Sequence, residues 1–312
     1  MRSSRLLLAL LALLGTACAT TARDVSASSS PSSPGARPRA FLWEVTRPGV
    51  PDKPLYLTGS VHLGKPGQFV FPPSMEAALA RSQVLVVELD PDKVEPQKTQ
   101  TLVMLLGLFT PPDTLNAHLG AETRALLPKA LKRLGLSPVL VERMRPWLVS
   151  LTLAVTEMQK AGYSEGGGID RLLMERSRGK RTLVELETLE SQMGVLAGFP
   201  DEVQELMLKD QLQGAEAMET SMDQVASAWE GGDPESLASA LFLKKEDPLY
   251  RIYYQSLFYT RNRQMTDKLI PMLDGPDIHF VVVGAGHVVG EQGILDLLTR
   301  EGLRVRQLSR EP

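Results

Sequence analysis

The chain has 312 residues, of which 43% are hydrophobic and 23% are charged, and its formal net charge at pH 7 is -3. This length and composition suit a globular protein with one large core, or one core with a helical insertion. Because the basic residues are scattered and the net charge is slightly negative, the sequence argues against a nucleic-acid partner.

Residues 1–18 have the pattern of a signal peptide with a lipobox-like end. Met1–Arg5 carries two arginines, Leu6–Leu14 is a short apolar stretch, and small residues lead up to Cys18, the only cysteine of the chain. The apolar stretch is shorter than the roughly 20 apolar residues that a spanning helix needs. The lipobox match departs from the usual pattern at Gly15, where leucine is usual. We expect an exported lipoprotein that is anchored to a membrane of a bacterial cell envelope through Cys18, or a secreted or periplasmic protein if Cys18 is not lipidated.

Residues 19–40 are rich in serine, proline, alanine and arginine and lack apolar periodicity, so we expect a flexible tether. The folded domain is predicted over 41–312, with a helical middle at about 115–275. The predicted elements are strands at 41–47 and 55–60, a helix at 74–82, a strand at 84–89, helices between 121 and 161 and at 169–178, a strand at 181–186, helices at 188–199, 200–229 and 248–273 with a short one after 234, a strand at 279–283, a helix at 289–301 and a strand at 304–308.

Two of the predicted strands share a motif. Each ends in a glycine that a histidine follows three residues later, in Gly59-Ser-Val-His62 and in Gly284-Ala-Gly-His287. A helix and a further strand come after each motif, so the same order of elements occurs twice, at 55–89 and at 279–308. The sequence therefore predicts a mixed α/β fold whose central mixed sheet comes from a duplicated strand–GxxH–helix–strand unit, interrupted by a large helical insertion.

Polar residues fall at the carboxyl ends of four predicted strands: His62, Glu88, Glu187 and His287. Parallel strands bring these ends to one edge of a sheet, where open α/β sheets bind their ligands. Two imidazoles and one or two carboxylates suit zinc, manganese, cobalt or iron as a ligand set. A metal ion held in this way lowers the pKa of bound water and polarises a carbonyl, which suits amide or ester hydrolysis.

For several of these residues, a purely structural role is an alternative to metal binding or catalysis. Glu88 could be a solvated or helix-capping carboxylate, although it follows four apolar residues and would be costly to bury there. Glu187 could belong to the first turn of a helix, where acidic residues are favoured. Glu291 would share a helix face with His287 if the helix began early enough, but compensation of the helix dipole explains it better than metal binding does.

Other residues carry weaker signals. His118 and His279 are expected to be surface or packing residues. Arg261 and Asn262 lie on a predicted helix, and facing the crevice they could bind a carboxylate or stabilise an oxyanion. The sequence contains no Gly-x-Ser-x-Gly, His-Glu-x-x-His, Walker or Gly-x-Gly-x-x-Gly motif, so it lacks the signatures of serine hydrolases, zincins and nucleotide-binding proteins.

Six segments together resemble the TraB/PrgY/GumN family, which includes the Tiki proteins. They are Gly59-Ser-Val-His62-Leu-Gly64, Val87-Glu88-Leu89, Gly168-Ile-Asp170, Leu186-Glu187-Thr188, Arg261-Asn262 and Gly284-Ala-Gly-His287. The resemblance covers residues 41–308, and the paired Gly-x-x-His motifs are its most specific part. It implies a metal-dependent hydrolase, with Tiki members acting as membrane-anchored metalloproteases, and a fold related to erythromycin-esterase-like and ChaN-like proteins.

Residues and resemblance together lead to one prediction. The metal ligands are His62, His287 and Glu88, the catalytic residues are Glu88, Glu187, Arg261 and Asn262, and the cofactor is a divalent zinc, manganese or cobalt ion. The predicted function is a metal-dependent hydrolase that acts on a peptide or protein substrate. The alternative is a non-catalytic cell-envelope protein that sequesters a peptide, a metal or haem. An acidic ligand such as Glu88 favours the hydrolase, because haem capture needs an apolar slot and an axial ligand.

Overall fold

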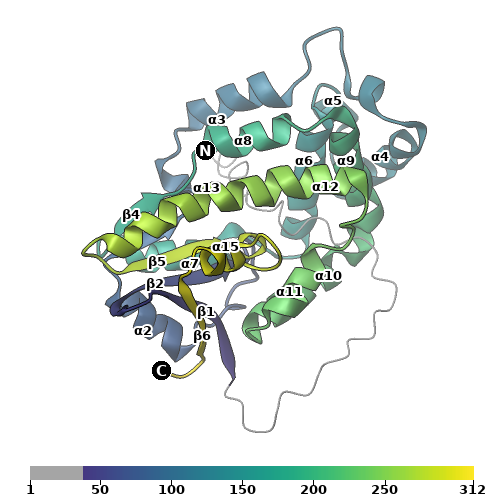
Figure 1. Ribbon diagram of the computed structural model, residues 1–312. Coiled ribbons are helices and arrows are strands. Elements are labelled where there is room, and N and C mark those ends of the chain that lie inside the picture. Colours follow the sequence, from purple (N-terminus) through teal and green to yellow (C-terminus); the bar gives the residue numbers. More distant parts are fainter. Residues whose placement is uncertain (1–37) are drawn as a thin grey trace.

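The computed structural model describes residues 38–312 (Figure 1). The predicted signal peptide with Cys18, and the predicted tether as far as residue 37, lie outside the described residues. Within the described part of the chain, no helix combines the length and the apolar character that crossing a membrane requires.

A six-stranded mixed sheet forms the centre of the fold, in the order β4-β3-β5-β2-β1-β6. The strands are β1 (Arg39–Arg47), β2 (Val50–Ser60), β3 (Val84–Val87), β4 (Thr182–Glu185), β5 (His279–Gly284) and β6 (Arg304–Ser309). Strands β2, β5, β3 and β4 pair in parallel, whereas β1 is antiparallel to both β2 and β6. The predicted mixed α/β class is therefore confirmed.

The register of the parallel strands aligns their carboxyl ends. His279 pairs with Leu55 on one side and with Val84 on the other, and Val84 in turn pairs with Thr182. All four residues of β3 are buried although successive side chains point to opposite faces, so both faces of the sheet are covered there. The loops that follow β2, β3, β4 and β5 consequently begin at the same edge of the sheet, the one formed by the carboxyl ends of these strands.

Helices surround this sheet and extend to one side of it (Figure 1). They are α2 (Pro73–Arg81), α3 (Pro96–Leu102), α4 (Ala121–Leu134), α5 (Pro138–Val141), α6 (Pro146–Lys160), α7 (Ile169–Ser177), α8 (Leu189–Ala197), α9 (Asp201–Gly214), α10 (Met218–Glu230), α11 (Pro234–Leu241), α12 (Pro248–Tyr254), α13 (Thr260–Leu269), α14 (Ala285–Val288) and α15 (Ile294–Arg300). Figure 1 shows α4, α5, α6 and α9 gathered away from the sheet. Their leucine-rich faces form a small apolar cluster beside the main core, with Leu127, Leu131 and Leu153 among its members.

Two predicted helices are wrong in extent. The single helix predicted at 200–229 is divided, because α9 ends at Gly214 and a short turn at Ala215–Ala217 precedes α10. The helix predicted at 289–301 is also divided, since a loop with positive φ at Gly290 (80°) and Gln292 (56°) separates α14 from α15. Glu291 lies in this loop and therefore shares no helix face with His287.

The predicted duplicated unit is present as an order of elements, β2-α2-β3 and β5-α14-α15-β6. The pairing of its strands differs between the copies. Strand β3 pairs directly with β5, whereas β6 crosses to the far side of β2 and β1 and pairs with β1. The two copies are therefore alike in their first strand and its Gly-x-x-His turn, but their second strands occupy different positions in the sheet.

Candidate functional site

The structure brings all six predicted site residues together at the carboxyl edge of the parallel strands. His62 lies two residues after β2, Glu88 directly after β3, and Glu187 two residues after β4. His287 lies in α14, which begins where β5 ends. Arg261 and Asn262 reach the same edge from α13, and both are buried.

The two histidines face one oxygen of Glu88. His62 Nε2 lies 4.0 Å from Glu88 Oε1, and His287 Nε2 lies 3.9 Å from the same oxygen. The side chains of His62, His287 and Glu88 are only 12%, 5% and 10% exposed. Two ring nitrogens and one carboxylate oxygen therefore converge in a region that is largely shielded from water.

Asn262 fixes the orientation of the His287 ring and determines which of its two nitrogens carries the proton. Its Nδ2 donates to the carbonyl oxygen of Gln292 at 2.8 Å, so its Oδ1 faces His287 Nδ1, 2.6 Å away. Because an amide oxygen only accepts, His287 carries a proton on Nδ1 and directs the lone pair of Nε2 towards Glu88. Both ends of the Asn262 amide are thus used, and Asn262 positions His287 rather than binding an oxyanion.

Asp170 supports His62 in a corresponding way. Its Oδ2 lies 3.2 Å from His62 Nδ1, an ion-pair contact whose angle falls outside hydrogen-bond geometry. Ser60 Oγ donates to Asp170 Oδ1 at 2.6 Å and accepts from the Asp170 backbone amide at 3.0 Å. A Cβ at Gly168 would lie 2.1 Å from the His62 carbonyl oxygen, so glycine is what lets the start of α7 approach this closely.

Asp170 was not among the predicted catalytic or ligand residues. Its segment Gly168-Ile-Asp170 belongs to the family resemblance, and that is the one signal in the sequence that could have identified it. Gln192 on α8 was also missed, and it carries no sequence signal. Its Nε2 donates to Glu88 Oε2 at 3.3 Å and to Glu187 Oε2 at 2.9 Å, so it joins the two carboxylates.

Arg261 is the centre of a buried ionic network. Its Nε donates to Glu187 Oε1 at 2.7 Å, and its Nη2 donates to Glu187 Oε2 at 2.6 Å and to Glu88 Oε2 at 2.9 Å. Nη1 donates to the Leu257 carbonyl at 2.9 Å. Arg261 therefore holds Glu88 by Oε2, which leaves Oε1 facing the histidines. Binding of a substrate carboxylate by Arg261, as the sequence suggested, is disfavoured because its guanidinium is already paired with Glu187 and Glu88.

The surroundings shift the pKa values of the two histidines in opposite directions. Burial, with Arg261 and His62 nearby, holds the pKa of His287 well below its usual value of 6.5. Burial alone would also lower the pKa of His62, but the carboxylates of Asp170 and Glu88 outweigh it and raise this pKa. Burial opposes ionisation of Glu187, yet its hydrogen bonds from Arg261 lower its pKa. His287 is therefore neutral at pH 7, and Glu187 is ionised.

The donor atoms are of the types that divalent metal ions bind in proteins, but they stand wider apart than the ligands of a bound ion do. Ligands of one tetrahedral zinc ion, with bonds of about 2.1 Å, are roughly 3.4 Å apart. Within residues 38–312, no three His, Cys, Asp or Glu side chains are near enough to coordinate one ion as they stand. The missing side chain of Gly284 leaves room between them, because a Cβ there would lie 2.8 Å from His62 Nε2 and 3.2 Å from Glu88 Oε1.

The other two histidines lie outside this site. His118 is in the helical part, where it contacts Asp113 at 2.8 Å and Asp201 at 3.1 Å and stacks on Phe109. His279 is the first residue of β5, at the opposite end of the strand from Gly284.

Comparison with known proteins places these observations in a family. Residues 41–307 match the model of the TraB/PrgY/gumN family. The chain is 26% identical over 262 residues to the uncharacterized protein YbaP of Escherichia coli (strain K12), an alignment that covers 83% of this chain and 93% of the relative. The YbaP protein of Shigella flexneri matches over the same length with the same identity. No solved structure matches the chain significantly.

Proposed function

Because the chain belongs to the TraB/PrgY/gumN family, we propose that it is a metal-dependent hydrolase that cleaves peptide bonds at the edge of its parallel strands. The observation that carries this proposal is the convergence of His62 Nε2 and His287 Nε2 on Glu88 Oε1, at 4.0 and 3.9 Å. Two histidines and a carboxylate form a common ligand set of hydrolytic metal sites.

His62, His287 and Glu88 would hold the ion, which we propose to be zinc, manganese or cobalt. When bound, such an ion lowers the pKa of water and polarises a carbonyl group. The supporting residues decide how well the three ligands are held. Asn262 fixes the Nδ1–H tautomer of His287, and Asp170 orients His62. Partners of this kind typically change metal affinity by about 10- to 100-fold when they are removed.

Glu88 has two separate tasks in this proposal. Oε2 is held by Arg261 and Gln192, so the carboxylate cannot rotate freely. Oε1 faces the space between the histidines and accepts from the Gly284 amide, so its remaining lone pair would bind the ion. It would act as the proton acceptor for the attacking water only when it is not bound to the ion. The low exposure of the site strengthens each of these electrostatic contacts, since little bulk water screens them.

We further propose that the protein works at a bacterial cell envelope, attached through lipidated Cys18. The support lies in the short apolar stretch of residues 6–14 and in the position of Cys18 behind small residues. Its substrate would then be a peptide or protein of the envelope.

The experiment compares the full-length chain with four variants. Each protein is stripped with chelator, reloaded separately with zinc, manganese or cobalt, and assayed on a mixed peptide library. We expect cleavage to return with metal, His62→Ala and His287→Ala to lose metal, and Glu88→Gln to lose activity by about 10²-fold or more. His118→Ala is the matched control, because this histidine lies outside the site, and it should behave like the unmodified chain.

Two outcomes would change the conclusion. Cleavage that persists in all three site variants would place the chemistry elsewhere in the protein. Metal binding without cleavage in every metal form would favour the alternative function, sequestration of a peptide, a metal or haem.

A further inference from the structure

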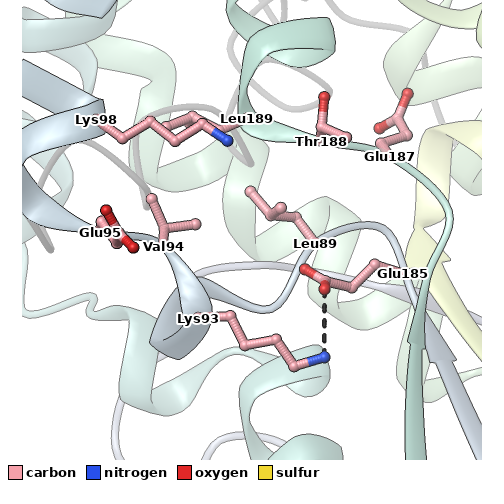
Figure 2. Close-up of a pocket in the computed structure, with 9 residues that line it drawn as sticks. All are labelled: Leu89, Lys93, Val94, Glu95, Lys98, Glu185, Glu187, Thr188 and Leu189. Carbon is pink, nitrogen blue, oxygen red and sulfur yellow. Dashed lines mark hydrogen bonds and ion pairs between the residues drawn. The ribbon is translucent and has the colours of Figure 1, made fainter. Parts of the chain in front are cut away.

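A pocket of about 380 Å³ lies at the same edge of the sheet, next to β3 and β4 (Figure 2). This volume is near the lower end of the roughly 300–1,000 Å³ typical of ligand pockets, so it suits a side chain better than a large ligand. Leu89 and Val94 contribute apolar surface to its wall, and Glu187 and Thr188 line another side of it.

The pocket is separated from the proposed reaction centre by two contacts. Glu187, which lines the pocket, accepts from Arg261 Nε at 2.7 Å, and Arg261 Nη2 is 2.9 Å from Glu88 Oε2. Leu89, another lining residue, directly follows Glu88 in the chain. An extended peptide advances about 3.3–3.6 Å per residue. A substrate side chain in the pocket would therefore belong to a residue within about two positions of the bond near Glu88.

The charges around the pocket leave one carboxylate uncompensated. Lys93 Nζ pairs with Glu185 at 3.3 Å, and Lys98 Nζ pairs with Glu190 at 2.6 Å, so both lysines already have partners. The charge of Glu187 is balanced by Arg261. Glu95 is exposed, and its carboxylate has no hydrogen-bond or ion-pair partner anywhere in residues 38–312.

We propose that this pocket binds the lysine or arginine side chain of a peptide substrate. Leu89, Val94 and Leu189 provide the apolar surface on which a methylene stem lies while its charged end stays in water. Glu95 at the rim supplies the opposite charge for that end. The inference rests on the proposed peptide hydrolysis, because it assigns the specificity of the same site.

Binding of small probes tests the pocket without relying on cleavage. The probes are N-acetyl-L-lysinamide, N-acetyl-L-norleucinamide, which has the stem without the ammonium, and an N-acetyl-L-glutamyl amide. Each is titrated by ligand-observed NMR against the full-length chain, Glu95→Gln, Val94→Trp and a matched control, Glu246→Gln, at an exposed glutamate outside the pocket. An exposed ion pair accounts for about a two- to fivefold preference.

We expect the lysine probe to bind about two- to fivefold more tightly than the norleucine probe to the unmodified chain and to Glu246→Gln. The two probes should bind equally to Glu95→Gln, and Val94→Trp should weaken both because its indole fills the pocket. Equal binding of both probes to the unmodified chain would overturn the proposal, and so would tighter binding of the glutamyl probe.

Cleavage of paired peptides provides the second measurement. Peptides that differ only by lysine or norleucine within two positions of the cleaved bond should show the same preference, and Glu95→Gln should abolish it. If the probes bind as expected but no peptide is cleaved, the pocket stands and the proposed hydrolysis fails. If peptides are cleaved without any lysine preference, the hydrolysis stands and the pocket assignment fails.

Discussion

Gly284→Ala tests whether the three converging atoms act as metal ligands. Gly284 has φ -50° and ψ 138°, a conformation that alanine adopts readily, so the backbone does not need glycine here. Its amide, which donates to Glu88 Oε1, is unchanged by the substitution. The added methyl group, however, points into the space between His62, Glu88 and His287.

The size of the effect follows from the distances. The new Cβ would lie 2.8 Å from His62 Nε2, 3.2 Å from Glu88 Oε1 and 3.5 Å from His287 Cδ2. A normal contact needs at least about 3.4 Å, so His62 must move by roughly 0.6 Å, about three times the ±0.2 Å tolerance of a metal–ligand bond. Overpacking of this kind costs about 1–3 kcal/mol of stability. We expect metal affinity to fall by about 100-fold or more, since a ligand is displaced and supporting contacts alone are worth 10- to 100-fold.

The assay measures metal affinity by isothermal titration calorimetry and stability by denaturant unfolding on the same preparations. Gly194→Ala is the control, because a Cβ at this exposed position in α8 meets no atom within 4 Å. It should gain about 0.5–1 kcal/mol of stability from the lower flexibility of alanine and keep its metal affinity. Metal binding by Gly284→Ala at the affinity of the unmodified chain would refute the assignment of His62 and Glu88 as joint ligands.

Three other outcomes are expected. Asp170→Asn should lower metal affinity by about 10- to 100-fold, because a neutral amide orients His62 less strongly, and unchanged affinity in a calorimetric titration would contradict that role. Burial raises the pKa of Glu157 above its usual 4.5, so the stability that its protonation provides is present at low pH and lost as pH rises through the raised pKa. Glu157→Gln should therefore become more stable relative to the unmodified chain as pH rises above 4.5 in denaturant unfolding, and a difference that stays constant with pH would show that reasoning to be wrong. Cys18→Ala should move the protein from the membrane to the soluble fraction of fractionated cells, and continued membrane association would count against lipidation.

The sequence was informative where apolar runs end in polar residues. His62, Glu88 and His287 each follow a buried strand, and the parallel arrangement that joins strand ends could be inferred from the order of elements. The close approach of these three side chains then depends only on neighbouring strands lying side by side. This is why the convergence of these three side chains could be predicted from periodicity and spacing.

The supporting contacts could not be predicted in this way, because they depend on helix directions that local sequence does not determine. Gln192 reaches Glu88 because α8 begins directly after the capping residue Thr188 and places Gln192 in its first turn, beside Glu187 and Glu88. The break between α14 and α15 depends on a positive φ at Gln292, and glutamine rarely adopts positive φ. The sequence therefore contains no signal for the break, and the apolar pattern predicted a helix through the loop. The backbone carbonyl of Gln292 accepts a hydrogen bond from Asn262, which in turn contacts His287, so this loop supports the candidate site.

The position of β5 in the sheet determines when the sheet can be completed during synthesis of the chain. Strands β2 and β3 are synthesised early, yet they do not pair with each other, because β5 lies between them and is made close to the end of the chain. Until His279–Gly284 has been synthesised, both earlier strands have an open edge, which is a template for aggregation. A chain that stops before β5 therefore loses more than His287, since its sheet is left in two halves. The sheet and the candidate site can therefore be completed only after β5 has been synthesised, and premature termination leaves an unfinished sheet as well as an incomplete site.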